Sequence, residues 1–138
     1  MMQPLLLDTC AVVWVAENEK LAPQAIEVLR STHEAGLLTY VSPITAWEIG
    51  LLASRDRLKL LITPQRWFAR LLATPTVRLA DMSPDLLIAS SFLPGRPPRD
   101  PADRIIAATA RDYGCILVTR DRALLDYGEQ GHIRVLAC

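Results

Sequence analysis

Short apolar runs alternate along this chain with stretches that carry the end signals of helices, and this alternation constrains the fold more than any other feature. Apolar runs of strand length occur at residues 4–8, 37–41, 76–80, 115–119 and 132–136. Strands that are separated by helices pair in parallel, and helices then cover both faces of the sheet. The sequence therefore predicts a three-layer α/β/α fold around a central, mainly parallel sheet of four to five strands.

Proline, glycine and small polar residues mark where the intervening helices begin and end. A Ser-Pro or Thr-Pro pair supplies an N-cap followed by proline at the first helical position, and a glycine just past the last turn ends a helix. Helices are expected over residues 10–18 and 23–35, after the pairs at 42–43, 63–64 and 83–84, and over residues 101–113.

Length and composition indicate one domain, residues 1–138, that is long enough to bury a core. The chain has 15 basic residues (Lys and Arg) and 15 acidic ones (Asp and Glu), so its net charge is zero. It therefore lacks the overall positive charge typical of nucleic-acid-binding proteins, and any such binding depends on local basic patches. The hydrophobic fraction of 51% is high for a small monomer. It suggests that some apolar surface is buried against a partner or a second copy.

Cysteine usage and the apolar runs indicate where the protein works. Cys10, Cys115 and Cys138 are widely spaced, which favours neither a disulfide framework nor a zinc site and fits a reducing cytoplasm. The longest apolar run, at residues 10–16, is far too short to span a bilayer, so no membrane association is expected. His33 and His132 fall in a helix end and a turn, where surface placement without a catalytic role is expected.

Two aspartates follow strands of the expected sheet. Asp8 closes the run at 4–8, and Asp121 follows the run at 115–119 with Thr119 two residues before it. Ligands of open α/β sheets bind at the carboxyl ends of the strands. Either aspartate alone would also suit an ordinary turn after a strand.

Glu48 stands among apolar residues of its expected helix. Ile44, Trp47, Leu51 and Leu52 surround it at helical spacing, so we expect it in the middle of the core-facing stripe. A buried charge is costly unless it is paired or bound to a metal. A buried ion pair with an arginine is the alternative interpretation.

The stretch RDPADRIIAATA, residues 99–110, carries two further aspartates. Asp100 precedes Pro101 and fits an N-cap, whereas Asp103 lies at the third helical position and heads the apolar stripe of its helix. A carboxylate there is also favoured by the positive end of the helix dipole. If Asp8, Glu48, Asp103 and Asp121 meet at one edge of the sheet, the cluster calls for a divalent cation, and oxygen ligands favour Mg²⁺ or Mn²⁺.

Four motifs in this order and spacing, LLLDTCAVVW, VSPITAWEI, RDPADRIIAATA and LVTRD, resemble the PIN-domain ribonucleases, in particular the VapC-like toxins of toxin–antitoxin modules. The resemblance covers nearly the whole chain. It implies a PIN-like fold, an endoribonuclease dependent on Mg²⁺ or Mn²⁺, a homodimer that can assemble further, and a small cognate antitoxin, VapB-like, that lies across the active-site groove. Relatives often carry the pattern HRDPFDR, in place of which this chain has Pro98 and Ala102.

The resemblance also implies the roles of individual residues. Asp8, Glu48, Asp103 and Asp121 are expected to be catalytic and to bind the metal, with Thr119 and Asp100 in support. The expected reaction is hydrolysis of an RNA phosphodiester by a water that the metal activates. Leu58, Leu60, Leu61, Trp67 and Phe68, within residues 54–68, are interpreted either as a helical-hairpin core or as a groove wall for the antitoxin.

Local basic residues are expected to hold the RNA, because the net charge does not. Taken singly, each of these arginines could equally be solvated or salt-bridged. The expected phosphate-binding residues are Arg96, Arg99, Arg104, Arg120 and Arg122. Two other functions stay open at this point: a non-catalytic PIN-like binding module, and an acid-cluster phosphatase acting on small molecules.

Overall fold

A computed structural model describes residues 3–17 and 20–138 of the chain. The central sheet has five strands in the order β3-β2-β1-β4-β5, and every neighbouring pair is parallel. This confirms the predicted α/β fold and fixes the sheet at the upper end of the predicted range. The strands are β1 (Leu5–Leu7), β2 (Thr39–Val41), β3 (Val77–Leu79), β4 (Ile116–Thr119) and β5 (Arg134–Ala137).

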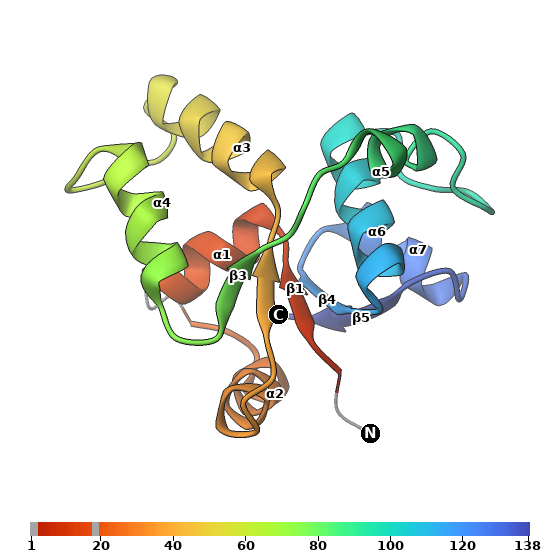
Figure 1. The fold of residues 1–138 in the computed structure, drawn as a ribbon, viewed down its shortest axis with the longest axis horizontal. Helices are drawn as coiled ribbons and strands as arrows, with labels where there is room; N and C mark the ends of the chain where they lie inside the picture. Colours follow the sequence, from red (N-terminus) through yellow and green to blue (C-terminus); the bar gives the residue numbers. More distant parts are fainter. Residues whose placement is uncertain (1–2, 18–19) are drawn as a thin grey trace.

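Helices connect the strands and cover the sheet on both sides (Figure 1). Asn18, at the end of the helix expected over 10–18, lies outside the described residues. The last strand begins two residues later than expected, and the other ends differ from the expected ones by two residues or fewer. The helices are α1 (Thr9–Ala16), α2 (Pro23–Glu34), α3 (Pro43–Ser54), α4 (Pro64–Ala73), α5 (Pro84–Ala89), α6 (Pro101–Tyr113) and α7 (Arg122–Glu129).

Alternate side chains of each strand feed two separate cores. Leu5 and Leu7 of β1 pack with residues of α1, α2 and α4 on one face of the sheet. Leu6 packs with Ile106 of α6 and Leu124 of α7 on the other face. Successive side chains of a strand point to opposite faces, so strands buried on both sides read as unbroken apolar runs. This two-sided burial is the reason for the three-layer architecture.

The capping residues that the sequence indicates are in place. Ser42, Thr63 and Ser83 each accept a hydrogen bond from a backbone N–H in the first turn of α3, α4 and α5. Gly114 ends α6 in a left-handed conformation, with φ +63°. These caps fix where each helix leaves the sheet, and so they also fix the position of the side chains in its first turn.

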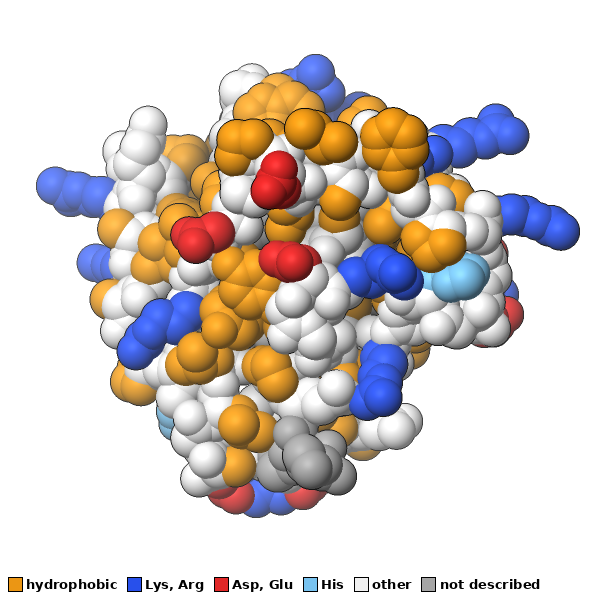
Figure 2. All heavy atoms as spheres, turned by 45° about the vertical axis from the view of Figure 1, so that its right-hand side comes forward, with side chains coloured by type: hydrophobic (Ala, Val, Ile, Leu, Met, Phe, Trp, Pro, Cys, Tyr) orange, Lys and Arg blue, Asp and Glu red, His pale blue; other side chains and the backbone are white. Residues whose placement is uncertain are grey.

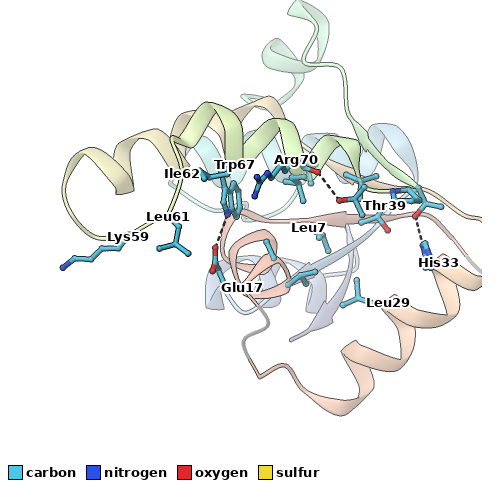
Figure 3. Close-up of a pocket in the computed structure, with 18 residues that line it drawn as sticks. Leu7, Glu17, Leu29, His33, Thr39, Lys59, Leu61, Ile62, Trp67 and Arg70 are labelled. Atoms are coloured by element: carbon cyan, nitrogen blue, oxygen red, sulfur yellow. Dashed lines mark hydrogen bonds between the residues drawn. The ribbon is translucent and has the colours of Figure 1, made fainter.

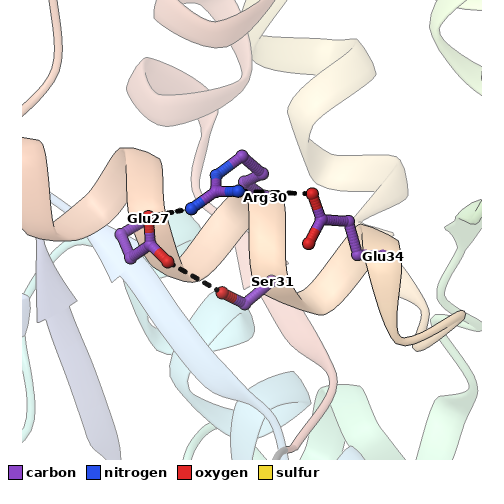
Figure 4. Close-up of polar contacts among 4 residues, drawn as sticks. All are labelled: Glu27, Arg30, Ser31 and Glu34. Carbon is purple, nitrogen blue, oxygen red and sulfur yellow. Dashed lines mark hydrogen bonds and ion pairs between the residues drawn. The ribbon is translucent and has the colours of Figure 1, made fainter.

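The outer face of α2 is polar and solvent-exposed. Arg30 contacts Glu27 one turn before it and Glu34 one turn after it, and Ser31 donates to Glu27 (Figure 4). Exposed pairs of this kind add little to stability. Over the described residues, no helix combines the length and apolar character needed to cross a membrane.

Candidate active site

Asp8 occupies the centre of the sheet edge. It follows β1 and caps α1, because its Oδ1 accepts a hydrogen bond from the Ala11 N–H at 2.8 Å. The Thr119 hydroxyl of the neighbouring strand β4 donates to Oδ2. Burial raises the pKa of Asp8, these two hydrogen bonds lower it in part, and the charge of Asp121 raises it further.

Thr119 links Asp8 to Asp121. Its side chain is fully buried, and its Oγ1 also accepts a hydrogen bond from the Asp121 N–H at 3.0 Å. Asp121 in turn caps α7 by accepting from the Leu124 N–H at 3.0 Å. The register pairs Leu7, the last residue of β1, with Val118, one residue before the end of β4, so the aspartates that follow the two strands lie at the same edge of the sheet. The expected meeting of Asp8 and Asp121 at one edge is therefore observed.

Glu48 reaches the same edge from α3, but the predicted orientation of this helix is wrong. The buried residues of α3 are Thr45 and Ile49, whereas Trp47, expected in the core, is 58% exposed. Apolar residues occur all around α3, so their periodicity did not identify the buried face. Glu48 is consequently only half-buried, at the border of the core, and not in the middle of a buried stripe.

Glu48 is held by a hydroxyl that the sequence analysis did not single out. The Thr9 Oγ1 donates to Glu48 Oε1 at 2.5 Å and lies 3.1 Å from the Thr45 Oγ1. Burial raises the pKa of Glu48, the hydrogen bond from Thr9 lowers it, and the charges of Asp100 and Asp8 raise it. Two sequence signals were available: Thr9 follows Asp8 directly, and Thr45 lies one helical turn before Glu48.

Among the described acids, Asp103 has the most strongly raised pKa. Burial is the largest cause that raises its pKa, and the charges of Asp121, Asp100, Glu48 and Asp8 add to it in that order, so that the pKa reaches about 7. The stripe that it heads is buried as predicted. All four neighbouring carboxylates are thus within electrostatic reach of Asp103.

Asp100 caps α6 as the sequence predicts. Its Oδ1 accepts hydrogen bonds from the N–H groups of Ala102 and Asp103, at 2.8 and 3.2 Å. The two aspartates of the stretch 99–110 therefore differ in their contacts. One carboxylate saturates the amides of the helix start, and the other faces the remaining acids.

No basic side chain neutralises this cluster among the described residues, whose ion pairs involve only Arg30 and Arg122. The exposed Cys10 reports the same field, since burial and then the charges of Asp8, Glu48, Asp121 and Asp103 raise its thiol pKa to about 11. Figure 2 shows acidic side chains set among hydrophobic ones on one face of the molecule. An uncompensated set of carboxylates in apolar surroundings is chemically suited to a divalent cation.

The distances limit how an ion could be held. Over residues 3–17 and 20–138, no three His, Cys, Asp or Glu side chains approach closely enough to hold one ion together. Mg²⁺ keeps several waters and needs only one or two direct carboxylates. The donor set therefore fits a hydrated Mg²⁺ or Mn²⁺ ion, with the more distant acids reaching it through water.

The structure separates the five arginines that were expected to bind phosphate. Arg120 lies 3.5 Å above the Trp14 ring and donates to the Cys138 carbonyl at 2.8 Å, so its guanidinium is engaged away from the acids. Arg104 donates to the Ser90 carbonyl at 3.4 Å, and Arg122 lies 3.8 Å from Asp126. The exposed side chains of Arg96 and Arg99 are in the loop before α6.

That loop is anchored to the end of α7. The Gln130 side chain accepts from the Arg96 N–H at 2.8 Å and donates to the Arg96 carbonyl at 3.0 Å. Tyr127 donates to the Pro94 carbonyl at 2.7 Å. Gly95 has φ +71° and packs so closely on His132 that a Cβ would come within 2.5 Å of its ring. His132 is thus half-buried in contact with the loop, unlike the exposed His33.

A second feature, a groove of about 590 Å³, lies on the face covered by α1, α2 and α4 (Figure 3). Its walls are mainly apolar, and the Trp67 Nε1 donates to Glu17 Oε1 at 3.1 Å on one side of it. Within residues 54–68 only Ser54, the last residue of α3, and the first half of α4 are helical, so the hairpin interpretation holds only in part. Ile62 and Phe68 pack on the core, whereas Leu61 lines the groove and is fully exposed.

Comparisons with known proteins agree with this geometry. A family model described as the PIN domain matches residues 5–130. Ribonuclease VapC22 of Mycobacterium tuberculosis is 35% identical over 124 residues, which cover 89% of this chain and 91% of that protein.

Solved structures share the fold at low sequence identity. The structure of VapBC2 from Rickettsia felis, bound to a DNA fragment from their promoter, superposes with a TM-score of 0.68 at 14% identity over 99% of both chains. A toxin–antitoxin complex from Klebsiella pneumoniae gives 0.56 at 21% identity, covering 87% of this chain and 89% of that one. FitAcB from Neisseria gonorrhoeae gives 0.57 at 20% identity over 96% of both chains.

Proposed function

Because the chain belongs to the PIN domain family and is similar to a VapC ribonuclease within it, we propose that it is a metal-dependent endoribonuclease, the toxin of a toxin–antitoxin pair. The observation that carries this proposal is the gathering of Asp8, Glu48, Asp103 and Asp121 from four different elements. Among the described residues these carboxylates form no ion pair with a basic side chain, and burial and mutual repulsion raise the pKa of Asp103 to about 7.

The four carboxylates have distinct tasks in the proposed reaction. Asp8 and Asp103 would be the direct ligands of a Mg²⁺ or Mn²⁺ ion, while Glu48 and Asp121 would reach it directly or through water. When bound, the ion supplies charge neutralisation at the phosphate and acidifies a water molecule. One of the four carboxylates would act as general base and take up the proton of the attacking water. No 2′-hydroxyl nucleophile is needed, so the products carry a 5′-phosphate and a 3′-hydroxyl.

The substrate is proposed to be RNA, held by local cations beside the acids. Arg96 and Arg99 are the best candidates, because their side chains are exposed and Gln130 and Tyr127 anchor their loop. Arg104 can contribute from the first turn of α6, next to Asp103. Arg120 is a weaker candidate, since it is stacked on Trp14.

The partner is proposed to be a small antitoxin that binds in the groove lined by Leu61 and Trp67 (Figure 3). The groove presents apolar walls to solvent, and Leu61 is left fully exposed. An amphipathic segment of another protein would cover these walls. The relatives from Klebsiella pneumoniae and Rickettsia felis were solved as a toxin–antitoxin complex and as VapBC2.

An RNA-cleavage assay with Mg²⁺ or Mn²⁺ tests the proposed activity. Asp103→Asn and Asp8→Ala should abolish cleavage, whereas Asp100→Asn should leave it close to wild type, because asparagine caps helices as well as aspartate does. Asp100→Asn is the matched control, three residues away on the same helix. Equal losses from Asp100→Asn and Asp103→Asn would mean that Asp100 is also a ligand.

Two outcomes would replace the proposal. Cleavage that survives both Asp8→Ala and Asp103→Asn would sink the proposed site, and no cleavage by the wild type under any divalent cation would favour a binding module. Hydrolysis of nitrophenyl phosphate without cleavage of RNA would identify a phosphatase instead.

A further inference from the structure

Thr9 sits in a notch between two side chains of α3. It is the first residue of α1, it follows Asp8, and it is only 7% exposed. Its Oγ1 lies 2.5 Å from Glu48 Oε1 and 3.1 Å from the Thr45 Oγ1. Thr45 is fully buried and precedes Glu48 by three residues, so both side chains lie on the same face of α3.

Hydrogen-bonding rules fix the direction of this chain of hydroxyls. An ionised carboxylate only accepts hydrogen bonds, and a threonine hydroxyl has a single proton to donate. Thr9 must therefore give its proton to Glu48, and its oxygen must accept the proton of Thr45. The chain runs from Thr45 through Thr9 to Glu48, and it ends on a half-buried carboxylate of the active site.

We propose that Thr9 and Thr45 are positioning residues that set the distance between Asp8 and Glu48 and so tune the affinity for the divalent cation. Thr9 ties Glu48 of α3 to the residue next to Asp8, across a separation of 39 positions in the chain. It engages Oε1 of Glu48, so Oε2 would be the oxygen offered to a bound ion. This inference rests on the proposed metal-dependent function.

Packing alone does not account for the arrangement. A valine at position 9 would fill nearly the same volume, but Glu48 Oε1 would lose the hydroxyl that donates to it. A valine at position 45 would leave that donor in place and remove only the hydroxyl that Thr9 accepts from. Without the Thr9 donor, the Glu48 carboxylate can rotate toward water. Part of the free energy of ion binding would then be used to reorient it, so the affinity would fall. Outer hydrogen-bond partners of metal ligands typically change affinity by about ten- to a hundredfold when they are removed.

The test measures Mg²⁺ binding separately from catalysis. Mg²⁺ is titrated into each variant, and the midpoint is the Mg²⁺ concentration that gives half of the full rise in unfolding temperature. RNA cleavage is then measured at saturating Mg²⁺. Thr9→Val should raise the midpoint by about ten- to a hundredfold, Thr45→Val by less, and Thr9→Ser should restore the wild-type value because it keeps the hydroxyl.

Thr109→Val is the matched control. Thr109 is also buried, but its hydroxyl donates to the Ile105 carbonyl of its own helix at 2.7 Å and not to an acid. Its midpoint should equal that of the wild type. Any loss of stability in chelator that both valine variants share is then a packing effect.

The outcomes separate this inference from the proposed function. A midpoint for Thr9→Val within about twofold of wild type, or no rescue by Thr9→Ser, overturns the positioning role. If Thr9→Val fails to fold, Thr45→Val decides in the same way, and an unchanged midpoint overturns the role. A wild type that neither responds to Mg²⁺ nor cleaves RNA overturns the proposed function and this inference together.

Discussion

At the scale of single residues, the charge state of Asp103 links the site to stability. Its carboxyl is half-buried beside four other acids, and these surroundings raise its pKa to about 7. Asp100, three residues earlier, instead accepts hydrogen bonds from two backbone amides of the helix start. The same residue type thus serves a cap at one position and a cation site at the other, because the two carboxylates meet different partners.

The metal-free protein should lose stability as the pH rises from about 4 to about 7. The folded state holds a proton on Asp103 up to a pKa of about 7, whereas the unfolded state releases it near the ordinary value of 3.8. The unfolded state therefore binds fewer protons in this range, and stability falls with rising pH. Thermal unfolding in chelator at about pH 5 and about pH 8 measures the effect.

Asp103→Asn is the variant that isolates this contribution. It removes the titrating group, so it should raise the unfolding temperature more at the higher pH than at the lower one. Mg²⁺ should stabilise the wild type at the higher pH and the variant much less. A pH profile of the wild type parallel to that of Asp103→Asn would contradict the raised pKa.

At the scale of elements, helix ends were easier to predict than helix faces. At the Ser-Pro, Thr-Pro and Asp-Pro pairs, the capping side chain bonds to a backbone N–H only two or three residues further on. Because these hydrogen bonds are local, α3, α4, α5 and α6 begin where expected. The buried face of α3 was missed, because Trp47 and Ile44 are as apolar as Ile49 and only the neighbouring helices decide between them. Element ends depend on nearby residues, whereas faces depend on distant ones.

Two glycine variants should change stability in opposite directions. Gly114→Ala should lower the free energy of unfolding by about 1–2 kcal/mol, because alanine at φ +63° is strained although no atom lies within 4 Å of the added Cβ. Gly50→Ala, within α3, should raise it by up to about 1 kcal/mol, because its Cβ also meets nothing within 4 Å and alanine favours helix. Denaturant unfolding measures both. A free energy of unfolding that does not fall for Gly114→Ala would refute the role of Gly114 as the C-cap of α6.

At the scale of the whole molecule, apolar surface remains that one copy does not cover. Ile88 is 61% and Phe92 81% exposed, four residues apart at the end of α5, and the high hydrophobic fraction of the sequence agrees with a covered face. We propose that this surface contributes to a homodimer. Neither residue lines the groove of Figure 3, where Leu61 is an exposed large hydrophobic residue.

Changing one surface should leave the other intact. Ile88→Glu combined with Phe92→Ser should shift the protein from dimer to monomer, because a charge replaces buried apolar contact. Leu61→Glu, at an even more exposed position, is the control and should remain dimeric. Sedimentation analysis over a range of protein concentrations measures the change. A wild type that is monomeric throughout, or a dimer that survives both substitutions, would contradict the assignment.

The sequence by itself determined the order of strands and helices along the chain, the caps and the two-sided burial of the strands, because each depends on residues close together in the chain. It also singled out the four acids as candidates for the site. Only the tertiary structure decided that Asp121 lies beside Asp8 through Thr119, that Thr9 and Thr45 hold Glu48, and that Arg120 stacks on Trp14. These contacts join residues tens of positions apart, and strand register and helix packing alone bring them together.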